Sequence, residues 1–178
     1  MELTRGEMAG HLEILERRIA NACAAAGRPR ESVLLVWVSK FHPAEAVENA
    51  IALGAKVFGE NRVQEAESKF SEHRTALDGS PVQCHVIGPV QSNKLKKAAV
   101  VADCIHSIAS MEAVEKLEKI CAAIPGDTGK VLEILFQVNA GEEETKSGLS
   151  VENADAFLAE LEKAAGACGP DGKSEKFP

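Results

Sequence analysis

The sequence has no apolar run long enough to cross a lipid bilayer. Its longest runs, such as residues 33–38, fall far short of the roughly 20 apolar residues that a membrane-spanning helix needs. Charged residues, among them Glu2, Arg5 and Glu7, interrupt the N-terminal segment, which therefore lacks the apolar stretch of a secretory signal. We expect a cytoplasmic protein that makes no membrane contact.

Cysteine pairs and metal-ligand spacings are also absent from the sequence. Five cysteines are scattered without a C-x-x-C pair, which argues against a disulfide framework: Cys23, Cys84, Cys104, Cys121 and Cys168. No pair of histidines and no histidine–cysteine set has the spacing of a metal motif, so we expect no metal site. Neither a glycine-rich dinucleotide fingerprint nor a Walker A loop is present.

The sequence has no excess of positive charge. Its 178 residues include 27 acidic and 20 basic ones, which gives a formal net charge of −7. Because such a charge repels polyanions, we expect no nucleic-acid partner. Hydrophobic residues make up 45% and charged residues 26% of the chain, which is typical of a folded globular protein.

Segments of strand and helix character alternate along the chain. The expected strands are residues 33–38, 55–58, 82–87, 104–108 and 131–138, and the expected helices are residues 3–25, 43–53, 61–70, 91–100, 111–123 and 151–165. This alternation predicts an α/β fold with about five parallel strands. An open doubly wound sheet and part of a (β/α)8 barrel both fit, whereas a complete barrel typically needs roughly 250 residues. We expect one domain over residues 1–165 and a flexible polar tail over residues 166–178.

Polar side chains lie at the carboxyl ends of the expected strands, where parallel α/β folds bind their ligands. Lys40 and Asn61 follow the first two strands, and His85 and His106 lie in the third and fourth. A partly desolvated lysine amine can attack an aldehyde and form a Schiff base. However, a lysine at a strand end is more often simply solvated, and a histidine in an apolar strand is more often a core residue. The residue types alone therefore leave both interpretations open.

Five blocks of the sequence, in this order and at these intervals, resemble one known family. They are VWVSK (36–40), FGENRVQE (58–65), HVIGPVQSNK (85–94), IHS (105–107), and QVN (137–139) together with KSG (146–148). Each block by itself is weak evidence for a family, but five blocks in this order over most of the chain are a specific signal. The sequence is similar to the pyridoxal 5'-phosphate (PLP) homeostasis proteins, the YggS/PROSC family.

The resemblance implies a fold, a cofactor and site residues. The fold would be a (β/α)8 TIM-type barrel like the N-terminal domain of alanine racemase, here incomplete. PLP would be held as a Schiff base on Lys40, with Asn61 and His85 lining the pocket and Lys146 as a second lysine that handles PLP. Family members are regarded as non-enzymatic carriers or regulators of the PLP pool, so apo forms of PLP enzymes are the expected protein partners.

The sequence departs from the family pattern in two respects. Arg62 stands where a tyrosine commonly follows Gly-Glu-Asn, which would place a charge near the pocket. The blocks that supply most of the phosphate cradle in relatives, Ser-Met-Gly-Met-Ser and Arg-Ile-Gly-Thr, do not occur in the chain. We therefore expect a C-terminally truncated member, with self-association through uncovered sheet edges.

Two alternatives remain beside the regulator. The first is a truncated fragment that binds PLP weakly or not at all. The second is a PLP-dependent amino-acid racemase, which would need an acid–base residue on the other cofactor face, usually a tyrosine from another domain. The racemase is disfavoured, because the sequence contains no tyrosine.

Overall fold

The chain folds into one parallel sheet with helices packed along it. A computed structural model describes residues 3–124, 131–143 and 145–165. The strands are β1 (Trp37–Val38), β2 (Val57–Glu60), β3 (Gln83–Val86), β4 (Cys104–Ile108) and β5 (Glu133–Phe136). The helices are α1 (Arg5–Ala25), α2 (Ala44–Ala52), α3 (Val63–Phe70), α4 (Leu95–Val101), α5 (Met111–Ala122) and α6 (Val151–Ala165), with the 3-10 turns η1 (Arg30–Ser32) and η2 (Ser92–Lys94). The expected tail, residues 166–178, lies outside the described residues.

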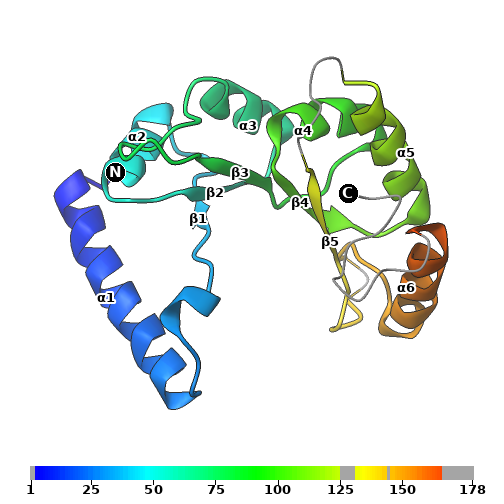
Figure 1. The fold of residues 1–178 in the computed structure, drawn as a ribbon, viewed down its shortest axis with the longest axis horizontal. Helices are drawn as coiled ribbons and strands as arrows, with labels where there is room; N and C mark the ends of the chain where they lie inside the picture. Colours follow the sequence, from blue (N-terminus) through cyan, green and yellow to red (C-terminus); the bar gives the residue numbers. More distant parts are fainter. Residues whose placement is uncertain (1–2, 125–130, 144, 166–178) are drawn as a thin grey trace.

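The strands follow one another across the sheet in chain order. All four neighbouring pairs are parallel, from β1 at one edge to β5 at the other. A doubly wound sheet would reverse its strand order at a switch point. The sequential order instead fits part of a (β/α)8 barrel, and Figure 1 shows the sheet as an arc with helices α2 to α5 along its outer side.

The hydrophobic core lies between the arc and its outer helices. Phe58 of β2 packs against Phe70 of α3, with ring centroids 5.4 Å apart. Leu95 of α4 and Ile105 of β4 are likewise buried in this layer. Side chains of a strand point alternately to its two faces, so every second strand residue reaches this core.

The inner face of the arc is largely uncovered. Val38 of β1 is 48% exposed and Leu135 of β5 is 50% exposed, although their neighbours Trp37 and Phe136 pack against the core. The continuous apolar run at residues 33–38 would be typical of a strand covered on both faces, but here one face is open, because no strand among the described residues lies across from these side chains.

The elements match the expected ones with a few corrections. The first strand is confined to Trp37–Val38, which is shorter than the expected residues 33–38. The expected helix over 91–100 divides into η2 and α4. Ser110 caps α5, accepting a hydrogen bond of 3.3 Å from the backbone N–H of Ala113. No helix in the described part of the chain is both long and apolar enough to cross a membrane.

Candidate functional site

Lys40 and Asn61 lie side by side at the carboxyl ends of β1 and β2. Val38 pairs with Gly59 in the sheet, and Gly59 pairs with His85. Lys40 follows Val38 by two residues, and Asn61 follows Gly59 by two residues. Because strand side chains alternate between the two faces, both side chains are directed to the inner face of the sheet, as Val38 is. The sheet register therefore brings together three of the predicted site residues, Lys40, Asn61 and His85.

A buried ion pair holds the backbone just before Lys40. The ammonium of Lys69 on α3 lies 2.7 Å from Glu60 Oε1 and donates a hydrogen bond of 2.7 Å to the carbonyl of Ser39. The hydroxyl of Ser39 donates to the same carboxylate oxygen at 2.7 Å. The side chains of Lys69 and Glu60 are 8% and 0% exposed. This network fixes Ser39 on the outer layer, and alternation then turns Lys40 inward.

The residue after Lys40 is held as well. Phe41 has a φ of 65°, in the left-handed region that a non-glycine residue adopts only when its surroundings hold it there. Its backbone N–H donates a hydrogen bond of 3.0 Å to Glu65 Oε2 on α3. The backbone on both sides of Lys40 is therefore anchored to α3, which leaves the lysine side chain as the free part of the turn.

The Lys40 amine is not neutralised by a carboxylate within the part of the chain that the structure describes. Its Nζ lies 6.0 Å from the centroid of the Phe41 ring, and the guanidinium carbon of Arg62 lies 5.8 Å from the same ring. The ring is 71% exposed. Arg62 thus lies near the same ring as Lys40, and its guanidinium is also 3.8 Å from Glu65 Oε1.

The loops after β2 and β3 contact each other and strand β4 below Lys40. A Cβ atom at Gly88 would lie 2.4 Å from the backbone oxygen of Asn61, so only glycine permits the two loops to approach this closely. Ser107 extends the contact to β4, because its hydroxyl donates a hydrogen bond of 2.8 Å to the carbonyl of Gly88. Three of the sequence blocks therefore meet in one set of loops. Arg62, and not Asn61 at the start of the expected helix 61–70, is the residue directly before α3, and its side chain makes no capping hydrogen bond.

His85 is buried beside a second histidine. Its Nδ1 lies 3.0 Å from Nε2 of His106 on β4, and the side chain is 4% exposed. Burial lowers the pKa of His85, and the nearby charge of His106 lowers it further. Burial also lowers the pKa of His106. Both rings are thus held in the neutral form, in which each offers one hydrogen-bond donor and one acceptor.

Lys146 lies in the loop after β5, away from the other predicted site residues. Its ammonium is 2.6 Å from Glu143 Oε1. The loop is tied to β5 by a hydrogen bond of 2.6 Å from the Gln137 amide to the carbonyl of Ser147. Three strands separate β5 from β1. The structure therefore does not place Lys146 beside Lys40, and its role stays a prediction.

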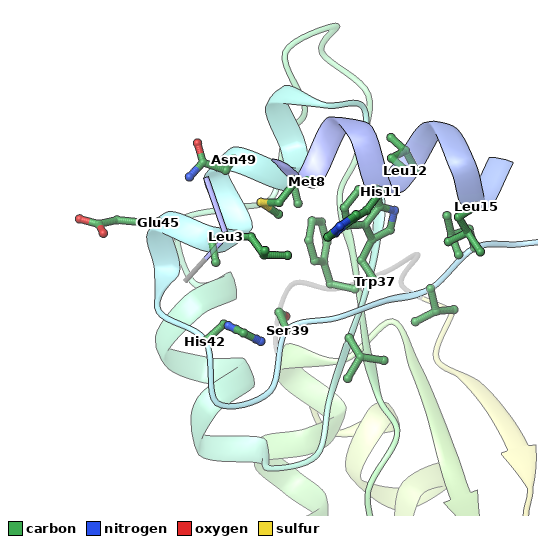
Figure 2. A pocket seen from close by; sticks show the side chains of 16 residues that line it. Leu3, Met8, His11, Leu12, Leu15, Trp37, Ser39, His42, Glu45 and Asn49 are labelled. Atoms are coloured by element: carbon green, nitrogen blue, oxygen red, sulfur yellow. The ribbon is translucent and has the colours of Figure 1, made fainter. Parts of the chain in front are cut away.

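A cavity of about 390 Å³ occupies a different place, between α1, α2 and the edge strand β1. Figure 2 shows its apolar side chains, including Leu12 and Trp37, with Ser39 and His42 at one end. Lys40, Asn61 and His85 are not among the lining residues. The cavity reflects the loose packing of α1 against the sheet and is not the candidate site.

Comparison with known proteins decides the family. The family model described as "Alanine racemase, N-terminal domain" matches residues 11–172. The chain belongs to this family. A Pseudomonas aeruginosa protein named "Pyridoxal phosphate homeostasis protein" is 40% identical over 147 residues, which are 82% of this chain and 60% of that relative. An Escherichia coli K12 protein of the same name is 35% identical over 154 residues, 86% of this chain and 63% of that relative.

Solved structures are similar to this chain in fold. PipY of Synechococcus elongatus without PLP is 35% identical, with a TM-score of 0.63 over 82% of this chain and 64% of that one. PipY with PLP bound is 34% identical, with a TM-score of 0.61 over the same shares, 82% and 64%. A protein from Bifidobacterium adolescentis is 28% identical, with a TM-score of 0.74 over 90% and 68%. The predicted family and fold class are confirmed, and the chain spans about 60% of the length of these curated relatives.

Sequence reasoning missed the residues that hold the Lys40 turn in this alanine racemase-type domain. Lys69 looks like a solvated residue in the last turn of a helix, and nothing nearby in the sequence marks it as buried. Glu60 offered the better signal, because it ends a strand that is buried throughout and would need a partner there. Only the packing of α3 against β2 shows that the partner is Lys69.

Proposed function

We propose that this chain binds PLP and serves intracellular PLP homeostasis as a non-enzymatic cytoplasmic carrier or regulator, with the cofactor held as a Schiff base on Lys40. The observation that carries the proposal is the Lys40 turn. Its backbone is anchored on both sides, and its amine lies on the inner rim with no carboxylate partner in the described residues. The names of the relatives and the PLP-bound PipY structure support the choice of cofactor.

Each site residue has a distinct role in this proposal. PLP supplies an aldehyde carbon that an amine can attack, and Lys40 supplies the amine. Asn61 and the neutral His85 orient the ring by hydrogen bonds from neighbouring strands. Lys146 acts as a second lysine that receives or releases the cofactor, which requires its ion pair with Glu143 to open. Apo forms of PLP enzymes are the proposed recipients.

The donors of the described site fit the ring and aldehyde of PLP better than its phosphate. The amine, the amide and the imidazole belong to residues in or just after the neighbouring strands β1, β2 and β3, whereas the two phosphate-cradle blocks of the family are not in the sequence. We therefore propose that binding is weaker than in relatives that contain these blocks. A fragment that does not bind PLP at all is the alternative outcome of the test.

A spectroscopic titration tests the proposal. The protein mixed with PLP should acquire a yellow absorbance band that survives gel filtration, and peptide mapping after borohydride reduction should locate the adduct on Lys40. Lys40→Ala should lack the band, whereas Lys96→Ala, which removes an exposed lysine of α4, should retain it. Absence of the band from the wild-type protein would refute PLP binding. An unchanged band in Lys40→Ala would refute the assignment of the lysine.

The non-enzymatic role needs its own assay. The protein with added PLP should not interconvert L- and D-alanine, because a racemase needs a second acid–base group and the chain has no tyrosine to supply it. Transfer of the cofactor from the yellow protein to an apo PLP enzyme should restore the activity of that enzyme. Measurable racemisation that Lys40→Ala abolishes would contradict the regulator and support the enzyme.

A further inference from the structure

The inner face of the sheet carries a cluster of metal-ligating side chains that the spacing of the sequence does not reveal. His85 lies on β3, and Cys104 and His106 lie two residues apart on the neighbouring strand β4. His85 pairs with Cys104 in the sheet register. Residues two apart on a strand point to the same face, so all three side chains meet there. One ligand atom from each residue lies within 4.8 Å of the other two.

We propose that His85, Cys104 and His106 form a binding site for a borderline transition-metal ion, with Zn²⁺ as the first candidate. Two imidazole nitrogens and one thiolate are donors that Zn²⁺ prefers over oxygen-only sites. Tetrahedral coordination at the usual bond lengths would place the donor atoms about 3.3–3.6 Å apart. The present separations, 3.0 Å between the two ring nitrogens and at most 4.8 Å within the set, reach these values through small side-chain rotations.

Two carboxylates near the cluster add negative charge around it. Glu133 of β5 pairs with Cys104 in the register and carries a negative charge toward both Cys104 and His85. Asp103 also contributes negative charge, but its carboxylate is engaged by Arg74 at 2.7 Å. Glu133 is not among the residues whose ligand atoms lie within 4.8 Å of one another, so a water molecule would complete a four-coordinate shell.

Binding must release the thiol proton of Cys104. Burial and the two carboxylates raise the pKa of Cys104 to about 11, so the metal-free thiol is protonated at neutral pH. Coordination would form the metal–sulfur bond and transfer the thiol proton to solvent.

A titration with Co²⁺, a spectroscopic substitute for Zn²⁺, tests the site in the absence of PLP and under reducing conditions. One equivalent should produce a thiolate-to-cobalt charge-transfer band in the near ultraviolet, which added Zn²⁺ removes. Cys104→Ala should abolish the band, and His106→Gln should weaken binding at least about tenfold. Cys121→Ala is the matched control, since it removes a cysteine of α5 outside the cluster and should leave the band unchanged.

The outcomes separate this site from the proposed PLP function. No charge-transfer band, or a band that persists in Cys104→Ala, would overturn the metal site. Circular dichroism shows whether each variant folds; if Cys104→Ala does not fold, the affinity of His106→Gln decides. Because the titration contains no PLP, failure of PLP binding leaves its result intact. Since His85 belongs to both sites, we further expect bound Zn²⁺ to weaken PLP binding to the wild-type protein, although Lys40 is not a ligand of the metal.

Discussion

Replacement of Lys69 by methionine should destabilise the protein more than the replacement of an exposed charged residue does. The substitution keeps the length of the apolar stem and removes the ammonium, so the carboxylate of Glu60 retains only the hydroxyl of Ser39 as a hydrogen-bond donor. Its second oxygen, Oε2, already has no partner in the structure and is buried. Removing one member of a buried ion pair typically costs about 3–5 kcal/mol, because the other charge stays behind without compensation.

Urea unfolding measures this cost. The single tryptophan, Trp37, lies in β1 next to the Lys40 turn, and its fluorescence can be followed together with circular dichroism. Lys97→Met is the matched control, because Lys97 pairs with Glu67 at 3.0 Å while the two side chains are 59% and 52% exposed. Exposed pairs contribute only about 0–1 kcal/mol. The double variant Glu60→Gln/Lys69→Met removes both charges and should recover about 0.5–3 kcal/mol of the loss.

Two results would refute this reasoning. The first is an unfolding free energy of Lys69→Met within about 1 kcal/mol of the wild type, or equal to that of Lys97→Met. The second is a double variant less stable than Lys69→Met. If the network also positions Lys40 through Ser39, folded Lys69→Met protein without urea should bind PLP more weakly than the wild type. Lys97→Met should bind PLP as the wild type does.

Three further predictions concern the glycine contact, the histidine pair and the uncovered face. Gly88→Ala should lose about 1–3 kcal/mol in urea unfolding, because its new methyl would lie 2.4 Å from a backbone oxygen; Gly10→Ala in α1 has open space and should gain about 0.5–1 kcal/mol. In the folded protein the pKa values of His85 and His106 are lowered. Below the ordinary histidine pKa of about 6.5, these two residues are therefore protonated more readily in the unfolded chain than in the folded protein. Stability should therefore decline as pH falls, and glutamine at both positions should flatten the decline; equal urea midpoints at about pH 7.5 and about pH 5.5 in the wild type would contradict this. Sedimentation should show concentration-dependent self-association that Leu135→Glu reduces, and a concentration-independent monomer would exclude association through this face.

The sequence by itself determined the strands, the helices and the family. Strand–helix alternation identified the α/β class, since the local apolar pattern reflects which side chains face the core. The ordered blocks identified the family and selected Lys40, Asn61 and His85 as site residues, which the register then placed together. The extent of β1 was overestimated, because only Trp37 and Val38 of the expected segment pair with β2.

Only the tertiary structure decided which distant residues meet. The ion pair between Glu60 and Lys69 arises from the packing of α3 on β2, and the close approach of Gly88 to Asn61 arises from two separate loops. The sequence predicted no metal site, yet the register of β3 and β4 brings His85 beside two side chains of β4. Linear spacing records neighbours along one strand or helix, whereas strand pairing sets contacts across the sheet between residues about 20 positions apart.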